Sequence, residues 1–368
     1  MKVVVTGANG FIGKNLIVRL RELGDVVVLT YVRGQDVSSL NELLAQADAV
    51  VHLAGENRPA DIQAFTDVNI DLVRDLCEGL AALGKTIPVL LASSIQAEQD
   101  NPYGRSKLAA EQLVEGLANL HGNPVAIYRL PGVFGKWCKP NYNSVVATFC
   151  HNKAHDLQVQ INDPGICIRL VYIDDVVSAF LGLLASDWRG ILRPIVEPEY
   201  SITLGDLSDQ IDAFKNCRSN LVSERVGTGL IRALYATYVS YLPVDKFAYN
   251  VPSYHDSRGI FVEMLKTPDT GQFSFFTAHP GITRGGHYHH TKTEKFLVIK
   301  GSARFGFRHM LTNEVHYLET NGNQPQIVET VPGWTHDVTN IGAEEMVVML
   351  WASEIFDRAN PDTFSSKV

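Results

Sequence analysis

The chain has 368 residues, of which 45% are hydrophobic and 20% are charged, and its formal net charge is −8. This length exceeds that of an ordinary single domain, so we expect two domains. The negative charge disfavours a nucleic-acid partner, and the lack of any run of eighteen apolar residues argues against a membrane span.

The first half of the chain alternates strand and helix patterns. Short β-branched apolar runs such as KVVVTG, DVVVLTYV and IPVLLASS predict buried strands, and longer amphipathic segments between them predict helices. Such alternation predicts a doubly wound parallel sheet. We therefore expect an α/β domain of the Rossmann type over residues 1–245.

A glycine-rich turn, TGANGFIG, follows the first predicted strand and opens a predicted helix. Glycines permit a tight turn and a close approach to a pyrophosphate, and the helix N-terminus supplies N–H donors. A purely structural turn is the alternative, but the strand–turn–helix context favours dinucleotide binding. The residues expected at the cofactor are Gly7, Asn9, Gly10, Phe11, Ile12 and Gly13.

The end of the second predicted strand bears on the choice of cofactor. An acidic residue there binds the ribose hydroxyls of NAD, whereas an arginine accommodates the 2′-phosphate of NADP. Arg33 lies where the acid is expected, and Asp36 follows slightly later, so NADPH is favoured. The alternative interpretation of Arg33 is a solvated loop cation.

Tyr103 and Lys107 lie four residues apart in YGRSK, so both side chains are expected on one helix face. A nearby ammonium would lower the pKa of the tyrosine and make it a useful acid or base. The strand before this helix ends in Ser93 and Ser94, and either hydroxyl could bond a substrate oxygen.

Residues 1 to about 245 resemble an extended short-chain dehydrogenase/reductase that acts on nucleotide sugars. The matches are TGANGFIG, HLAG, Asn69 in a predicted helix, the two serines, YGRSK, YRLPGVFG and YIDD. The resemblance implies a catalytic set of Ser94, Tyr103 and Lys107, in which Tyr103 protonates a sugar ketone as hydride arrives. Ser94 is preferred over its neighbour. Further cofactor contacts implied are Leu53, Ala54, Gly55, Asn69, Tyr103 and Lys107.

The pattern changes near residue 250. Short alternating runs such as GQFSFFTA, EKFLVIKG and EEMVVMLW, separated by turns, replace helical periodicity. They predict an all-β barrel or jelly roll over residues 246–368.

Two segments of this second half resemble the cupin motifs. GITRGGHYHHTKTEKFLVIKG matches the first motif, and VPGWTHDVTN matches the second with one residue fewer in its Pro-Gly spacing. The resemblance implies a cupin (jelly-roll) domain. Neutral imidazoles and a carboxylate suit Zn²⁺ or another borderline divalent cation.

A second resemblance competes for the same histidines. HDSRGIFVE and TRGGHY resemble the cupin-class 3-epimerases and 3,5-epimerases of sugar nucleotides. It implies that His287 is the base that removes a proton next to a keto group, and that Arg284 meets the diphosphate. Arg258 and Glu263 are further candidates for binding the sugar nucleotide.

The metal ligands therefore remain open between two sets. Strand alternation puts His287 and His289 on one face and His290 on the other. The plain cupin motif then selects His287, His289, Glu294 and His336. If His287 is instead the base, a local bend could bring His290 inward. We favour this second set, which comprises His290, Glu294 and His336, with His289 as a further candidate.

The whole chain resembles the family of CapF-type capsular polysaccharide enzymes. The resemblance implies that the cupin epimerises a UDP-4-keto-6-deoxy-HexNAc at C3 and that the reductase then reduces C4 with NADPH. The product would be UDP-2-acetamido-2,6-dideoxy-L-talose, on the route to UDP-N-acetyl-L-fucosamine. Since cupins commonly pair through their sheets, we expect a homodimer. The rival hypotheses are an NADPH-sensing binding protein with a metal-stabilised cupin dimerisation module, and a metal-dependent oxygenase.

The cysteines and the first residues bear on location. The five cysteines are scattered and form no CxxC pair, which fits a reducing compartment. The chain starts directly with a strand pattern and shows no signal peptide. We expect a cytoplasmic enzyme whose partner is a UDP-linked 4-keto-6-deoxy amino sugar.

Overall fold

The computed structural model describes residues 1–57, 61, 63–290, 292–359 and 361–368. Contacts group the described chain into two compact units, which are Met1–Ile211 with Ala233–Pro243, and Asp212–Arg232 with Val244–Val368. Residues 212–232 group with the second unit, although they precede the expected boundary near 245. They do so because Val222 bridges Lys266 and Arg225 pairs with Asp269 at 2.9 Å.

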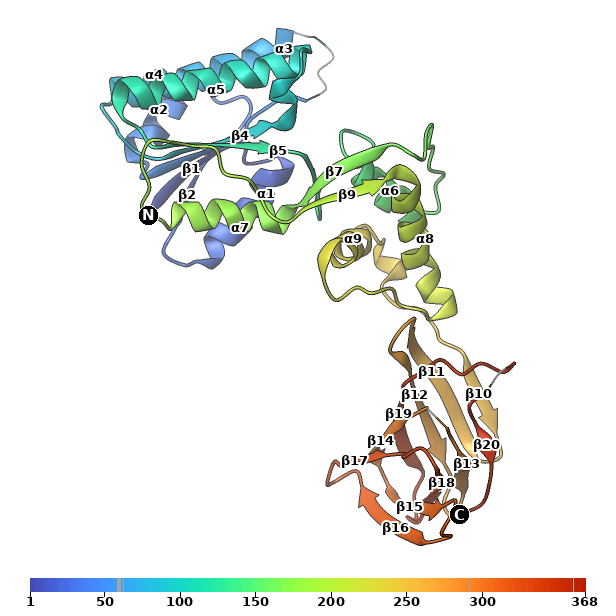
Figure 1. Ribbon diagram of the computed structural model, residues 1–368. Helices are drawn as coiled ribbons and strands as arrows, with labels where there is room; N and C mark the ends of the chain where they lie inside the picture. Colours follow the sequence, from blue (N-terminus) through green and yellow to red (C-terminus); the bar gives the residue numbers. More distant parts are fainter. Residues whose placement is uncertain (58–60, 62, 291, 360) are drawn as a thin grey trace. The chain divides into compact units, whose positions relative to one another are not determined.

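A six-stranded parallel sheet lies at the centre of the first unit, in the order β2-β1-β3-β4-β5-β8 (Figure 1). This confirms the predicted Rossmann-type parallel sheet. The chain passes from β1 to β2 on one side and then to β3 on the other, and ligands bind at the carboxyl ends of strands at such a reversal. The strands are β1 (Lys2–Thr6), β2 (Val27–Tyr31), β3 (Ala49–His52), β4 (Val89–Ser94), β5 (Val125–Leu130) and β8 (Ile191–Leu192).

Helices cover both faces of this sheet because its strands are apolar on both sides. Val3 and Val5 pack with α1 (Phe11–Glu22) and α7 (Ile173–Leu184) on one face. Val4 points to the other face. It packs there with α2 (Val37–Gln46), α4 (Leu72–Ala82) and α5 (Pro102–His121). Buried side chains of this kind each contribute roughly 1.5–3 kcal/mol, so the sheet is a rigid platform for its loops.

Smaller elements complete the helical part of the chain. A three-stranded sheet has the order β6-β7-β9, and α8 and α9 are divided between the two units. These elements are α3 (Gln63–Thr66), the π-helix η1 (Asp67–Asp71), the 3-10 helices η2 (Ile95–Glu98) and η3 (Val244–Lys246), β6 (Gly132–Phe134), α6 (Val145–Ala154), β7 (Cys167–Tyr172), β9 (Glu199–Thr203), α8 (Leu204–Asn220) and α9 (Gly229–Val239).

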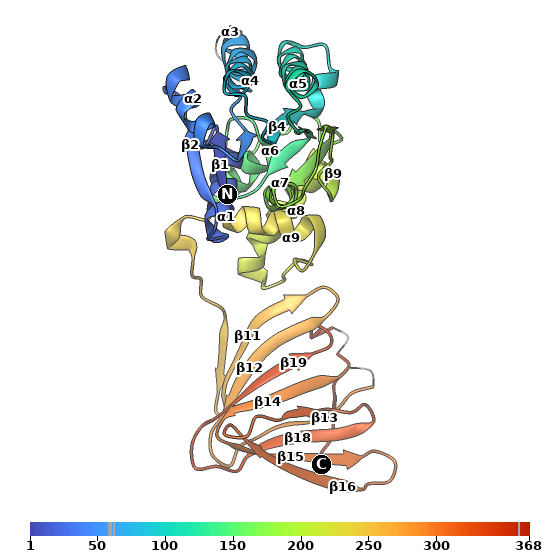
Figure 2. The same ribbon diagram turned by 90° about the vertical axis from the view of Figure 1, so that its left-hand side faces the viewer.

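The second unit is an antiparallel β domain of two sheets, in the orders β10-β11-β12-β19-β14-β17 and β16-β15-β18-β13-β20 (Figure 2). Phe276 and Phe296 from the first sheet pack with Phe305 and Val338 from the second, so the core lies between them. The strands are β10 (Ser253–Asp256), β11 (Gly259–Thr267), β12 (Gly271–Ala278), β13 (Thr283–Tyr288), β14 (Glu294–Lys300), β15 (Ser302–His309), β16 (Val315–Asn321), β17 (Ile327–Glu329), β18 (Trp334–Asn340), β19 (Met346–Ala352) and β20 (Phe364–Ser365).

None of the described helices is both long and apolar enough to cross a lipid bilayer.

Candidate functional site

The glycine turn after β1 packs directly against the segment that follows β3. Gly7 has a φ of 64°, and a Cβ on it would lie 2.6 Å from the backbone nitrogen of Ala54. A Cβ on Gly13 would lie 2.4 Å from the carbonyl oxygen of Gly7. Asn9 and Gly10 are exposed, and α1 begins immediately after them. The turn therefore offers exposed backbone and a helix N-terminus, which fits a dinucleotide pyrophosphate.

A buried hydroxyl fixes the segment after β3. The Thr6 Oγ1 accepts hydrogen bonds from the backbone nitrogens of Leu53 (3.1 Å) and Ala54 (3.2 Å), and it bonds His52 Nδ1 at 3.0 Å. Burial lowers the pKa of His52 to about 3, so its ring is neutral. This network joins the ends of β1 and β3, the two strands between which the strand order reverses.

Ser94, Tyr103 and Lys107 come together at the end of β4 and the start of α5. Asn101 caps this helix by accepting the Gly104 N–H at 2.8 Å, which places Tyr103 in its first turn. The Ser94 hydroxyl shares a hydrogen bond with Tyr103. The neighbouring Ser93 instead donates to the buried carboxylate of Glu111.

The electrostatics of this set differ from the expectation for Tyr103. Burial raises the pKa of Tyr103, and the bond with Ser94 opposes that rise only in part. Burial also lowers the pKa of Lys107 to about 8, with Glu111 opposing it. The ammonium donates to the carbonyl of Ala92 at 3.2 Å. The predicted net lowering of the tyrosine pKa is therefore wrong, because burial outweighs the bond with Ser94, and Tyr103 is a phenol that holds its proton.

Asn69 ties the segment after β3 to α5. Its amide nitrogen donates to Ser106 Oγ (2.9 Å) and to the carbonyl of Glu56 (3.1 Å), and its oxygen accepts the Glu56 N–H at 2.8 Å. A Cβ on Gly55 would lie 3.0 Å from Lys107 Nζ. The structure thus brings Gly55, Asn69 and Lys107 into one cluster.

Arg33 projects beside the same segment and forms an ion pair that the sequence does not indicate. Its Nη2 lies 2.6 Å from Glu56 Oε2, and the side chains are 80% and 15% exposed, respectively. Tyr142 donates to the other oxygen of Glu56 at 2.9 Å. Burial alone would raise the pKa of Glu56, but the bonds from Arg33 and Tyr142 lower it. Glu56 therefore carries a negative charge next to the arginine expected at the cofactor.

The second unit contains a cluster of three histidines and one glutamate. The possible ligand atoms of His287, His289, Glu294 and His336 all lie within 4.8 Å of one another. From Glu294 Oε2, the distances to Nε2 are 3.2 Å for His289, 3.4 Å for His336 and 4.0 Å for His287. The other oxygen, Oε1, lies 3.1 Å from the buried Lys292 ammonium.

Strand pairing explains how these residues meet. A bulge between Gly285 and His287 sets His287 opposite His336 on β13 and β18, and their ring centroids are 4.6 Å apart. Glu294 begins β14, in the opposite sheet. The cluster therefore joins the two sheets of the domain.

The donor set fits a divalent cation. Burial would raise the pKa of Glu294, but the three nearby histidines and the charge of Lys292 lower it well below its usual range. Burial lowers the pKa of His336, and both of its ring nitrogens are buried without a hydrogen-bond partner. A carboxylate facing neutral imidazole nitrogens is the coordination chemistry of Zn²⁺.

His290 does not join this cluster, contrary to the favoured ligand set. It is exposed, its ring lies 5.0 Å from that of Phe364, and its backbone nitrogen donates to Asp362 at 2.8 Å. The bulge precedes His287, so strand alternation is preserved from His287 to His289 and leaves His290 on the opposite side. The cluster therefore contains His287 and His289 and does not contain His290.

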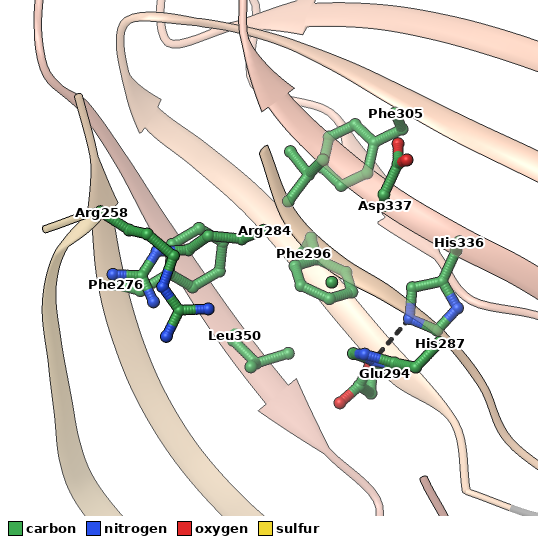
Figure 3. A pocket seen from close by; sticks show the side chains of 12 residues that line it. Arg258, Phe276, Arg284, His287, Glu294, Phe296, Phe305, His336, Asp337 and Leu350 are labelled. Atoms are coloured by element: carbon green, nitrogen blue, oxygen red, sulfur yellow. Dashed lines mark ion pairs between the residues drawn. The ribbon is translucent and has the colours of Figure 1, made fainter. Parts of the chain in front are cut away.

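Three members of the cluster, His287, Glu294 and His336, lie at one end of a pocket, and two arginines lie at the other (Figure 3). The Arg284 Nε donates to the Thr277 carbonyl at 2.9 Å, while its Nη2 is buried without a hydrogen-bond partner. Arg258 is held by Asp256 at 2.6 Å. Glu263, the third expected substrate residue, pairs with Lys266 at 2.8 Å and does not line this pocket.

Two family models match the chain. The NAD dependent epimerase/dehydratase family matches residues 3–191, which is more than half of the chain. The polysaccharide biosynthesis C-terminal domain matches residues 254–364.

Relatives extend the match over the full length. The UDP-2-acetamido-2,6-beta-L-arabino-hexul-4-ose reductase of Pseudomonas aeruginosa is 56% identical over 368 residues, covering 100% of this chain and 99% of the relative. A crystal structure of the capsular polysaccharide assembling protein CapF from Staphylococcus aureus has a TM-score of 0.91 at 41% identity and covers 100% of both chains. MoeE5, solved with UDP-glucose and NAD, has a TM-score of 0.55 at 21% identity over 65% of this chain and 98% of its own, and it shares the fold.

The chain therefore belongs to the NAD dependent epimerase/dehydratase family and is a CapF-like capsular polysaccharide biosynthesis protein with a polysaccharide biosynthesis C-terminal domain.

Proposed function

We propose that the chain is a bifunctional enzyme of nucleotide-sugar synthesis. The C-terminal unit epimerises a UDP-4-keto-6-deoxy-HexNAc at C3, and the N-terminal unit reduces the C4 ketone with NADPH. The product is UDP-2-acetamido-2,6-dideoxy-L-talose. The observation that carries the proposal is that one chain holds both a buried Ser94–Tyr103–Lys107 set and a histidine pocket with two arginines. Full-length similarity to a hexul-4-ose reductase supports the same substrate class.

The reductive half assigns each side chain of the N-terminal set one task. Bound NADPH supplies the hydride that adds to C4 of the sugar. Tyr103 gives its proton to the ketone oxygen at the same time, and its raised pKa keeps that proton available. Ser94 positions the ketone oxygen, and the Lys107 ammonium stabilises the phenolate that forms. The phenolate then recovers a proton from solvent.

The epimerising half uses the most accessible member of the histidine cluster. The side chain of His287 is 24% exposed, whereas those of His289 and Glu294 are 1% and 6% exposed. His287 takes the proton from C3, which is acidified by the C4 ketone. A water molecule protonates the enolate on the opposite face, and His287 passes its proton through solvent to the hydroxide that forms. The Nη2 of Arg284 makes no hydrogen bond and lies 3.9 Å from Asp256 Oδ1, so it and the nearby Arg258 suit the diphosphate of the substrate.

We assign a divalent cation, Zn²⁺, to the buried members of the cluster, which are His289, Glu294 and His336. When bound, it supplies a positive charge that holds these side chains in place. His287 is close enough to be a fourth ligand when no substrate is present. His287→Ala should retain zinc if His287 acts as the base, and should lose zinc if it is required as a ligand. The metal content of the purified variant measures this.

We further propose a homodimer formed through the C-terminal domain. The outer face of its six-stranded sheet carries an apolar depression, and Met264 and Ile299 on that face are 50% and 48% exposed. Apolar surface of this kind marks an interaction site in soluble proteins. A second copy of the chain is the occupant that we propose.

Proton exchange in D₂O separates the two reactions. The wild-type protein should place deuterium at C3 of the keto sugar without NADPH, and NMR of the product locates it. Tyr103→Phe should keep this exchange and lose NADPH oxidation. His287→Ala should lose the exchange and retain NADPH binding. The proposed division of labour fails if both variants lose both activities while remaining folded.

A further inference from the structure

The last strand of the chain lies beside the strand that carries His287. β20 pairs antiparallel with β13, with Ser365 opposite His287 and Phe364 opposite Tyr288. The rings of Tyr288 and Phe364 stack with centroids 5.3 Å apart. The Ser366 nitrogen donates to the Gly286 carbonyl at 2.9 Å. The C-terminal segment is therefore fastened along the edge of the histidine cluster.

Asp362, just before this strand, bonds the segment between His289 and Glu294 in three ways. Its carbonyl oxygen lies 2.5 Å from His289 Nδ1. Its carboxylate accepts the backbone N–H of His290 and that of Lys292, each at 2.8 Å. The carbonyl orients a ring of the cluster, and the carboxylate fixes the backbone on which that ring stands.

The bond to the carbonyl decides which nitrogen of His289 can bind a cation. A carbonyl only accepts, so Nδ1 carries a proton, and Nε2 is the nitrogen left to face the cluster. Nε2 lies 3.2 Å from Glu294 Oε2, which can only accept when the carboxylate is ionised. A cation or a proton must therefore lie between them. Ligating histidines generally have their second nitrogen bonded to a carbonyl or carboxylate in this way.

Asp362 also explains why the ring of His289 lies in the cluster and that of the adjacent His290 lies outside it. Asp362 holds the ring of His289 and only the backbone of His290. The ring of His290 is left to pack beside Tyr288 and Phe364. One aspartate thus separates the ring that joins the cluster from the ring that does not.

We infer that Asp362 is a positioning residue that selects the tautomer of His289 and presents its Nε2 to the cation site. The inference rests on the proposed function only in taking the cation to be Zn²⁺. Asp362 touches neither substrate nor cation and acts through His289 and the backbone of the following segment.

Zinc affinity of the full chain tests this inference. Asp362→Ala should weaken Zn²⁺ binding by roughly 10–100-fold, measured by competition with a chelator, because the backbone is released. Asp362→Asn keeps one acceptor oxygen but turns an amide donor toward a backbone N–H, so it should fall between Asp362→Ala and wild type. Lys367→Ala is the matched control, since that side chain is exposed in the same segment and the substitution keeps its backbone. It should bind zinc as wild type does.

The protonation of the two ring nitrogens of His289 gives a second measurement, which should not change if Asp362 only stabilises the fold. In the metal-free protein Glu294 shares a proton with His289 Nε2, so long-range ¹H–¹⁵N NMR should show wild-type His289 with a proton on Nδ1 as well. Asp362→Ala keeps the carbonyl but loses the carboxylate that anchors it, so the preference for a proton on Nδ1 should weaken. A chain that ends at residue 361 also lacks the carbonyl and should lose the preference altogether. Unchanged NADPH binding shows that the first unit remains folded.

The inference is overturned if Asp362→Ala keeps both the wild-type zinc affinity and the Nδ1–H tautomer. If wild type itself binds no zinc, the proposed cation is wrong. The tautomer comparison in the metal-free protein then still decides the role of Asp362.

Discussion

At the scale of single residues, we expect the charge of Lys107 to limit the proposed reduction at high pH. Its pKa of about 8 lies below the ordinary value because the side chain is buried. The ammonium is present below this pH and is lost above it. Tyr103, whose pKa is raised, keeps its proton over the same range.

We therefore expect kcat/KM for NADPH-dependent reduction to fall as the pH rises through about 8. Initial rates from neutral to alkaline pH measure this. In Lys107→Arg, whose guanidinium stays charged, the fall should move to higher pH even if the overall rate drops. An unchanged profile in that variant would assign the ionisation to another group.

Glu56 bears on the preference between cofactors. Its carboxylate forms an ion pair with the guanidinium of Arg33, which is the group expected to bind a 2′-phosphate. Exposed ion pairs of this kind contribute about 0.2–1 kcal/mol, so Glu56→Gln should tighten NADPH binding by a factor of about 1.4 to 5. NADH binding should change less. Fluorescence titration of both cofactors measures this, with Arg33→Ala expected to weaken NADPH binding selectively. Equal weakening of both cofactors in Glu56→Gln would mean that the carboxylate serves the fold or the ribose.

At the scale of elements, the glycine turn packs so closely on the backbone of Ala54 that Gly7 has no room for a side chain. Gly7→Ala places a Cβ against the backbone of Ala54 in a left-handed conformation. It should cost about 1–3 kcal/mol of unfolding free energy and impair NADPH binding. Gly116→Ala is the matched control, because its Cβ would meet nothing within 4 Å inside α5. Gly116→Ala should raise the free energy of unfolding by about 0.5–1 kcal/mol. Urea unfolding and NADPH titration test both variants, and wild-type NADPH binding by Gly7→Ala would refute the role of the turn.

Local patterns predicted those parts of the site that lie within one element. The turn after β1 and the spacing of Tyr103 and Lys107 follow from strand and helix periodicity. The preference for His290 assumed a bend after His287, whereas the bulge lies before it. Glu56 and Asp362 could not be found in this way, because they reach their partners across 23 and 73 residues. No periodicity connects residues so far apart.

At the scale of the whole molecule, the outer face of the C-terminal sheet should decide the oligomeric state. Met264→Glu puts a charge on that apolar face and should shift a dimer toward monomer, because burying an unpaired carboxylate is costly. Sedimentation velocity measures the change. Leu311→Glu is the control, since Leu311 is 89% exposed outside the apolar depression. A Met264→Glu variant that sediments like wild type would exclude this face as the interface.

The contact between Asp362 and His289 also sets an order of events during synthesis. The ribosome adds His289 well before Asp362, because 73 residues separate His289 from its carbonyl partner, and even His336 precedes Asp362. A nascent chain that has exposed all four cluster residues therefore still lacks the group that fixes the His289 ring. If the positioning role of Asp362 holds, tight metal binding should therefore begin only after Asp362 has been added to the chain.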